Sequence, residues 1–279
     1  MINLRSLDPL IELAFAEDIG IGDITTEATV SSTQQAIGTF IAKSDGVIAG
    51  LPVAERTFKK LDATLTFQPF VNEGDTITAN TPIGEIQGNA KSILTGERTA
   101  LNFLQRLSGV ATLTAQFVNA VANYNVKVVD TRKTTPGWRA LQKYAVRVGG
   151  GNNHRFGLYD GILIKDNHIV AAGGIRNAVR RARQTAPHTA KIEVEVENIE
   201  QVSEALEAEA DILLLDNMSI DMMTQVVQQI GNRAITEASG GITLEQVQTV
   251  AATGIDLISV GALTHSAIPM DISLKLTLA

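Results

Sequence analysis

The stretch DILLLDNMSIDMMTQVVQQIGNRAITEAS, residues 211–239, decides the fold. It holds two short apolar segments, 211–216 and 234–239, separated by a segment whose apolar residues recur at helical spacing. Strands that alternate with helices of about 10–15 residues indicate βα units and therefore a parallel sheet. The stretch predicts a strand, a helix and a second strand parallel to the first.

The same alternation extends in both directions from this stretch. Strands are expected at 126–130, 161–165, 192–197, 211–216, 234–239 and 256–261, and helices within 198–210, 219–231 and 243–254. Right-handed crossovers leave two arrangements, an open doubly wound sheet or a closed barrel. Nearly every strand ends in a chemically capable group, as α/β barrels require at the carboxyl ends of their strands. The groups at these ends are Asp130 with Arg132 and Lys133, Lys165, Glu195, Asp216, Glu237 with Ser239 to Gly241, and Gly261. We expect an α/β barrel that is incomplete or has a further strand near 144–151.

The preceding part of the chain reads as a mixed α/β domain. A helix is predicted at 8–19 and antiparallel strands within 63–88, where the turns resemble lipoyl- or biotinyl-carrier folds but no lysine lies at a hairpin tip. A long helical region at 92–124, broken near Ser108 and Gly109, would bridge two domains. The predicted fold is a mixed α/β sandwich over residues 1–107 and an α/β barrel over 108–269. An amphipathic strand at 270–279 would return to the first domain.

Composition restricts the function. The 279 residues carry a net charge of −7 and include no cysteine. The sequence has no uninterrupted apolar run of about 18 residues, which a membrane-spanning helix would need. Charged residues are scattered through the first 20 positions, where a signal peptide would need an apolar core. We expect a soluble, cytoplasmic protein that binds neither nucleic acid nor membrane. Between Asp130 and His168, however, seven lysines and arginines face three carboxylates, which suits a site for small polyanions.

Residues 149–165 offer several groups for such anions. Three glycines precede Asn152, Asn153, His154 and Arg155, and Lys165 follows. Arginine presents a planar fork to a carboxylate or phosphate, whereas lysine supplies a point charge. His154 read alone would be a structural histidine, and Lys165 could instead form a Schiff base, as in barrel aldolases.

Carboxylates and glycines follow the later strands. Glu195 and Asp216 end neighbouring strands and would suit Mg²⁺ or a cationic transition state, although Glu195 could lie on a plain strand face and Asp216 could cap the next helix. Ser239, Gly240 and Gly241 precede an expected helix whose first N–H groups would bind an anion. With Gly261 and Ala262 after the next strand, they predict a phosphate site.

Several segments together resemble the quinolinate phosphoribosyltransferase family. They are LAFAEDIGIGDITTEAT (13–29), ERTALNFLQRLSGVAT (97–112), DTRKTTPGWRALQKYAVRVGGGNNHRFGLYDGILIKDNHI (130–169), EVEVEN (193–198), LLLDNM (213–218), EASGGI (237–242) and ISVGALTHSA (258–267). The resemblance spans essentially the whole chain. It implies a mixed α/β N-terminal domain, an incomplete seven-stranded α/β barrel, and a homodimer or higher oligomer whose sites are completed by the neighbouring subunit.

The resemblance also implies a reaction and its residues. A phosphoribosyl group would pass from phosphoribosyl pyrophosphate to quinolinate, with release of pyrophosphate and CO₂ and formation of nicotinate mononucleotide for NAD biosynthesis. Lys133, Lys165, Glu195 and Asp216 would be catalytic, with Glu195 and Asp216 also holding Mg²⁺. The further substrate-binding residues would be Arg98 from the partner, Thr131, Arg132, His154, Arg155, Ser239, Gly240, Gly241, Val260, Gly261 and Ala262.

Other functions remain open from the sequence. A nicotinate phosphoribosyltransferase would use a monocarboxylate, and a relative associated with molybdenum uptake resembles the same family. A Schiff-base aldolase and a non-catalytic binding protein are the remaining alternatives. The number of cations favours the dicarboxylate quinolinate.

Overall fold

The computed structural model describes residues 7–279, so the first six residues of the expected N-terminal domain lie outside it. The chain divides into two compact units. The first comprises Met1–Ala115, Thr135–Gly150 and Ser266–Ala279, and the second comprises Gln116–Thr134 and Gly151–His265. The units therefore interleave along the chain.

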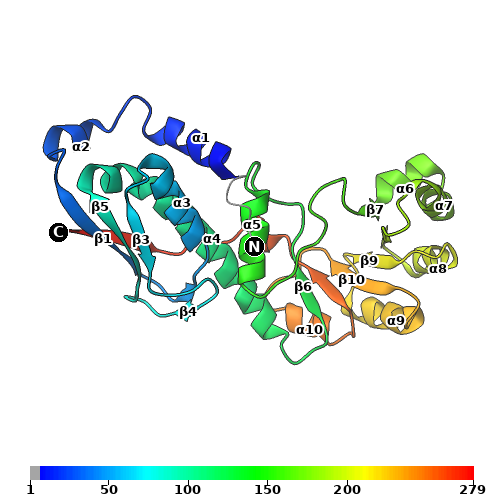
Figure 1. The fold of residues 1–279 in the computed structure, drawn as a ribbon. Helices are drawn as coiled ribbons and strands as arrows, with labels where there is room; N and C mark the ends of the chain where they lie inside the picture. Colours follow the sequence, from blue (N-terminus) through cyan, green and yellow to red (C-terminus); the bar gives the residue numbers. More distant parts are fainter. Residues whose placement is uncertain (1–6) are drawn as a thin grey trace. The chain divides into compact units, whose positions relative to one another are not determined.

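The first unit is built on an antiparallel sheet. Its strand order is β12 (Ile272–Leu278), β1 (Gln35–Ala42), β5 (Pro82–Asn89) and β3 (Thr66–Pro69). Alternate residues of β1 are buried, as expected for a strand with one face on a core. The helices α3 (Leu51–Leu61) and α4 (Ala90–Ala120) lie beside this sheet (Figure 1) and supply the other side of its core. In this core Phe40 of β1 packs against Phe58 of α3. The unit also contains the helices α1 (Asp8–Asp18) and α2 (Ile24–Thr29) and the paired strands β2 (Gly46–Val47) and β4 (Thr76–Ile77). The expected mixed α/β domain is confirmed.

The helix α4 is continuous, so the break expected near Ser108 and Gly109 is wrong. Both residues serve packing instead. The Ser108 hydroxyl accepts the backbone N–H of Ala49 at 3.1 Å. A Cβ on Gly109 would lie 2.1 Å from the carbonyl oxygen of Ile268, so only glycine permits this approach.

Among the described residues no helix is long and apolar enough to cross a bilayer.

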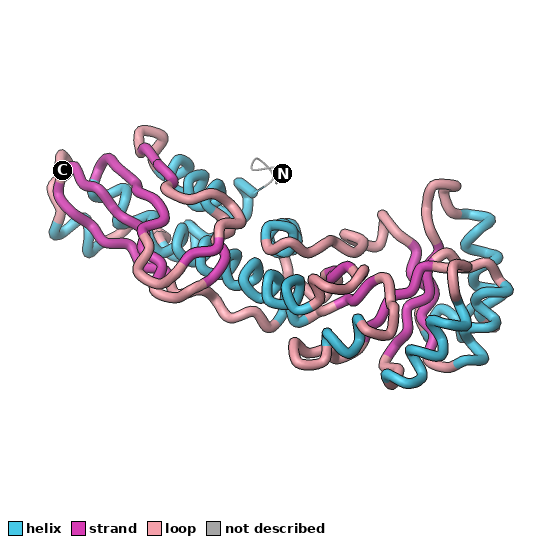
Figure 2. The backbone as a smooth tube through the Cα atoms, turned by 90° about the horizontal axis from the view of Figure 1, so that it is seen from below, coloured by secondary structure: helices cyan, strands magenta, loops and turns pink. Residues whose placement is uncertain are grey.

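The second unit contains a parallel sheet with the six predicted strands. Their order is β6 (Lys127–Val129), β11 (Leu257–Ser259), β10 (Ile235–Ser239), β9 (Ile212–Asp216), β8 (Ile192–Val196) and β7 (Ile162–Ile164). Every pair is parallel. The connecting helices are α6 (Asp166–Ala172), α7 (Ile175–Thr185), α8 (Ile199–Glu207), α9 (Ile220–Ile230), α10 (Val247–Ala251) and α11 (Ala262–His265). Figure 2 shows this bundle of strands with helices outside it. The order is that of an incomplete α/β barrel whose edges are β6 and β7.

The barrel is open between its edge strands β6 and β7, a gap that we call the seam. The expectation of a further strand near 144–151 is wrong. Residues 139–148 form the helix α5 (Arg139–Val148), in which Leu141, Ala145 and Val146 are buried at helical spacing. The seventh position of the barrel is a single residue, because Asn152 makes an isolated parallel bridge with Val129 of β6. The segment 153–161 then leads directly to β7.

Candidate active site

The parallel sheet places most of the predicted site residues at one edge. Lys165 follows β7, Glu195 lies near the end of β8, Asp216 ends β9 and Ser239 ends β10. The carboxyl ends of parallel strands share an edge of the sheet, so these residues, with 131–133 after β6 and 260–262 after β11, surround the mouth of the barrel.

Asp130 holds the segment that crosses the seam. This carboxylate is fully buried at the end of β6 and accepts hydrogen bonds from Asn153 Nδ2 at 2.6 Å and from the backbone N–H of His154 at 2.9 Å. The next residues form a turn in which Thr131 Oγ1 accepts the backbone N–H of Lys133 at 3.0 Å. Asp130 thereby fixes where His154 and Arg155 lie. From the sequence, Asp130 was expected as one of the polar groups at the strand ends, and its hydrogen bonds to residues 153 and 154 were not predicted.

Arg132 and Arg155 are held close enough to affect each other. The pKa of Arg155 is lowered by burial of the guanidinium and, next, by the positive charge of Arg132, while Glu193 and Asp160 act in the opposite direction. Arg155 also donates from Nη1 to the carbonyl oxygen of Gly161 at 3.0 Å. Two neighbouring guanidinium groups form a strong site for an anion with two negative charges.

Lys165 and Glu195 form an ion pair between the ends of β7 and β8. The lysine side chain is 46% exposed and the glutamate side chain 11% exposed. The backbone N–H of Lys165 donates to His168 Nδ1 at 3.0 Å at the start of α6. Each charged group therefore has a partner within the protein before any ligand arrives.

Asp216 faces the same side of the sheet as Glu195. Glu195 pairs in register with Leu214 of β9, and Asp216 lies two residues beyond Leu214, so both side chains project from one face. Asp216 accepts a hydrogen bond from Asn217 Nδ2 at 2.9 Å. It does not cap the next helix, because Ser219 is the N-cap of α9.

The glycines after β10 lie in a turn, and the helix expected directly behind them begins later. The helix α10 starts at Val247 and has five residues, so its N-terminus is not at Gly241. Gly240 and Gly241 have φ values of 109° and 59°. A Cβ on Gly240 would lie 2.2 Å from Asn217 Oδ1, so a side chain there would displace Asn217 and strain the backbone. The segment can approach a ligand through its backbone rather than through a helix end.

Lys133 lies beside Gly261. A Cβ on Gly261 would be 3.1 Å from Lys133 Cδ and 3.2 Å from His265 Nε2. Thr264 Oγ1 donates to the backbone carbonyl oxygen of Lys133 at 2.8 Å and ties its loop to the segment after β11. The structure thus brings together Lys133 and the glycine that follows the neighbouring strand, and it places Val260 and Ala262 on either side of that glycine.

A cluster inside the barrel was missed from the sequence. His154 Nε2 lies 3.1 Å from Glu193 Oε2 and 3.6 Å from Glu237 Oε1, and both glutamates are buried. The three residues line a cavity of about 410 Å³ that also reaches Lys127 and Lys191. The pKa of Glu237 is raised to about 7, first by burial and then by the Glu193 carboxylate. The available signal was the alternation of β8, which puts Glu193 on the same face as Glu195.

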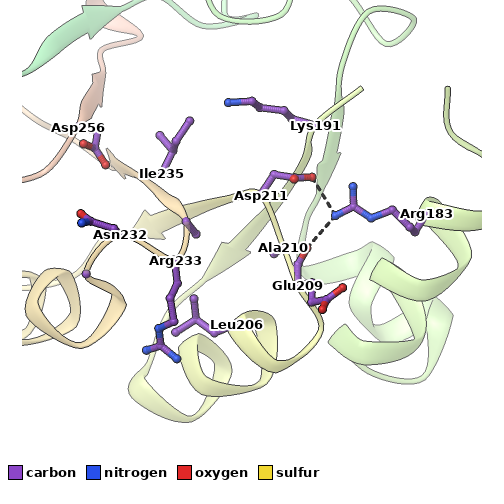
Figure 3. Close-up of a pocket in the computed structure, with 12 residues that line it drawn as sticks. Arg183, Lys191, Leu206, Glu209, Ala210, Asp211, Asn232, Arg233, Ile235 and Asp256 are labelled. Carbon is purple, nitrogen blue, oxygen red and sulfur yellow. Dashed lines mark hydrogen bonds and ion pairs between the residues drawn. The ribbon is translucent and has the colours of Figure 1, made fainter. Parts of the chain in front are cut away.

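A larger cavity, of about 760 Å³, lies elsewhere. It is lined by residues at the starts of strands, such as Lys191, Asp211 and Asp256 (Figure 3). Arg183 in it pairs with Asp211 at 2.9 Å, and Arg233 donates to the backbone carbonyl of Gln229 at 2.5 Å. The arginines serve the fold there, and none of the predicted site residues lines this cavity.

Arg98 lies in the first unit. It is an exposed residue of α4. The remaining predicted residues all belong to the second unit.

Comparisons with known proteins agree with this geometry. Residues 23–108 match the quinolinate phosphoribosyl transferase N-terminal domain, and residues 110–275 match the C-terminal domain. A probable nicotinate-nucleotide pyrophosphorylase [carboxylating] of Bacillus subtilis is 45% identical over 278 residues, covering 100% of this chain and 96% of that protein. The protein of the same description from Synechocystis is 46% identical, covering 97% of this chain and 92% of its own length.

A solved structure is similar throughout. The crystal structure of NadC from Streptococcus pyogenes superimposes with a TM-score of 0.96 at 44% identity and covers 100% of this chain and 99% of its own. Both domain matches and these relatives lead to one conclusion. The chain is a member of the quinolinate phosphoribosyltransferase family.

Proposed function

We propose that this protein transfers the phosphoribosyl group of phosphoribosyl pyrophosphate to the ring nitrogen of quinolinate. Nicotinate mononucleotide, pyrophosphate and CO₂ are the products, in the de novo synthesis of NAD. The protein is then a glycosyltransferase of the pentosyltransferase class. The observation that carries the choice of substrate is the neighbouring pair Arg132 and Arg155. The pKa of Arg155 is lowered first by burial and then by the Arg132 charge, and a bound dicarboxylate would compensate for both.

The acceptor binds among the cations of the mouth. Arg132, Arg155 and Lys165 take the two carboxylates, with His154 beside them and Arg98 supplied by a partner subunit. A carboxylate that reaches Lys165 competes with Glu195 for its ammonium group. Binding of quinolinate therefore releases Glu195 for the second substrate.

The donor binds along the other strand ends. Lys133, with Thr131 in its turn, takes the pyrophosphate. Glu195 and Asp216 accept hydrogen bonds from the ribose hydroxyls. The 5-phosphate is held by backbone groups of Ser239, Gly240, Gly241, Val260, Gly261 and Ala262.

The chemistry consists of two bond exchanges. The quinolinate nitrogen bonds to C1 of the ribose while the bond from C1 to the pyrophosphate oxygen breaks, and pyrophosphate leaves with the electron pair. Glu195 and Asp216 stabilise the positive charge that develops on the ribose. The bond to the adjacent carboxylate then breaks, CO₂ leaves, and the ring carbon keeps the electron pair, which the pyridinium charge stabilises until a proton is taken up. The protein contributes orientation and electrostatics.

Mg²⁺ fits the carboxylates at the mouth. Glu195 and Asp216 are hard oxygen donors on one face, and Mg²⁺ in phosphate-transfer sites commonly takes one or two carboxylates together with substrate oxygens. In that position the ion would offset negative charge on the departing pyrophosphate.

A homodimer or higher oligomer in the cytoplasm is part of the proposal. The exposed position of Arg98 on α4 suits a residue offered to a neighbouring site. The acidic net charge and the lack of cysteine suit the cytoplasm.

The test is a paired assay of the purified protein with Mg²⁺ and phosphoribosyl pyrophosphate. Quinolinate should give the mononucleotide, whereas nicotinate should give none. Product from nicotinate alone would replace the proposal with a nicotinate phosphoribosyltransferase. Borohydride trapping of a carbonyl substrate on Lys165 would support the aldolase alternative, which the ion pair with Glu195 disfavours because a Schiff base requires a neutral amine.

A further inference from the structure

The His154 imidazole is fixed on both of its nitrogens. Nδ1 accepts the backbone N–H of Arg155 at 2.7 Å, so the hydrogen of the ring lies on Nε2. Nε2 points at Glu193 Oε2, 3.1 Å away, with Glu237 Oε1 at 3.6 Å. The ring therefore links the buried carboxylate of Glu193 to the backbone of Arg155.

The two glutamates are costly to bury. Glu193 is 4% exposed and Glu237 is 1% exposed, and each has one carboxylate oxygen, Oε1, without a hydrogen-bond partner in the described part of the chain. Burying a carboxylate costs free energy, and here two carboxylates lie close enough for Glu193 to raise the pKa of Glu237, after burial itself. Stability alone does not account for this pair.

The two glutamates are connected to the backbone of Arg155 through the His154 ring. Its neighbour His154 is held by Asp130 through the main chain, and its own N–H depends on the orientation of the imidazole. Its guanidinium lies near Arg132, where small displacements change the match to a planar carboxylate.

We propose that Glu193, supported by Glu237, is a positioning residue for the acceptor: it holds the His154 ring from inside the barrel, and through Nδ1 the ring holds Arg155 in place for a substrate carboxylate. The inference rests on the proposed function, since it assigns Arg155 to quinolinate. It adds two interior carboxylates that act without touching either substrate.

The kinetic test compares three single variants with the wild type. Glu193→Leu leaves the imidazole N–H without its acceptor and should raise the KM for quinolinate about tenfold. The KM for phosphoribosyl pyrophosphate and the thermal midpoint should stay near wild type. Glu193→Gln keeps a neutral acceptor and should raise the quinolinate KM about threefold. Glu200→Gln removes the same charge from an exposed residue of α8 and is the matched control.

A spectroscopic readout keeps the inference separate from the proposed function. The chain has four histidines, so the ring ¹⁵N signals of His154 are assigned by comparison with His154→Gln. The wild type should show the hydrogen on Nε2 in slow exchange, faster exchange in Glu193→Gln and the fastest in Glu193→Leu. This order is measurable even if the wild type makes no product from quinolinate, a result that would overturn the proposed function alone.

Three results would overturn the inference. An active wild type with unchanged quinolinate KM in both Glu193 variants would show that the ring needs no support. Equal losses for both substrates together with a lower thermal midpoint would indicate a purely structural role. A stoichiometric divalent ion in the purified wild type that is lost in Glu193→Leu would make the cluster a metal site instead. If Glu193→Leu does not fold, Glu193→Gln decides, and values identical to wild type in KM and ring exchange contradict the inference.

Discussion

Lys165 and Glu195 face each other across two neighbouring strands and neutralise each other at the mouth of the barrel. The proposed reaction needs them apart, one on the acceptor and the other on the ribose. In the proposed reaction, the ion pair is the arrangement before binding, and the substrates replace it with new contacts.

Glu195→Gln separates the two roles. The amide stabilises the developing ribose charge poorly, so kcat should fall by roughly a hundredfold. The KM for quinolinate should fall or stay constant, because Lys165 no longer has a competing carboxylate. Steady-state kinetics with each substrate varied in turn checks this. A raised quinolinate KM with unchanged kcat would mean that Glu195 serves the acceptor instead.

Arg132→Ala removes one half of the arginine pair. We expect kcat/KM for quinolinate to fall roughly a thousandfold, since a desolvated carboxylate loses its bidentate partner. The circular dichroism spectrum and thermal midpoint should remain those of the wild type. Arg132→Lys should recover only part of the loss, because an ammonium group lacks the planar fork. Unchanged activity in Arg132→Ala would remove this residue from the site.

Gly240→Ala tests the backbone cradle after β10, by which we mean the backbone groups of residues 239–241 that are proposed to hold the 5-phosphate. The new Cβ would collide with Asn217 Oδ1, and the φ of 109° is unfavourable for alanine. The KM for phosphoribosyl pyrophosphate should rise about tenfold or more, as a misplaced backbone loses hydrogen bonds to the phosphate. Gly231→Ala is the control, because Gly231 also has a positive φ, of 55°, but nothing lies near its Cβ. It should lower stability by about 1 kcal/mol without changing either KM. Equal kinetic effects of both variants would contradict the cradle.

Glu237 predicts a pH dependence of stability. Its pKa is raised from 4.5 to about 7 by burial and by Glu193, so the folded protein binds more protons than the unfolded chain between these values. The stability associated with the protonated carboxyl is fully present below pH 4.5 and is lost as pH rises through 7. The charged groups around it are Glu193 and His154, with Lys127, Lys191, Arg155 and Asp160 also lining the cavity. The free energy of unfolding, measured with urea at pH 5 and pH 8, should fall less with rising pH in Glu237→Gln than in the wild type. An equal fall in both proteins would show that Glu237 is not the group responsible.

The strands of the barrel could be predicted because their apolar segments are short and each ends in a polar group. The seam could not. The valines at 146 and 148 resemble a strand, but burial of Leu141, Ala145 and Val146 selects a helix, and the seventh strand is reduced to the bridge at Asn152. Gly109 was predicted to break a helix. Its actual role, close packing against Ile268, involves a residue distant in sequence and could not be predicted.

The residues around the mouth of the barrel could be predicted to lie together, because the carboxyl ends of parallel strands share one edge of the sheet. The interior cluster was not. Glu193 looks like one of several alternating glutamates, and only the crossing of the seam by residues 153–161 brings His154 between β8 and β10. The partners of Asp130 likewise depend on that crossing.

The most direct measurement follows quinolinate labelled in the carboxylate next to the ring nitrogen. Labelled CO₂, pyrophosphate and nicotinate mononucleotide should appear in equal amounts, only when phosphoribosyl pyrophosphate is present. Label retained in the nucleotide product, or nucleotide formed from nicotinate and not from quinolinate, would contradict the account.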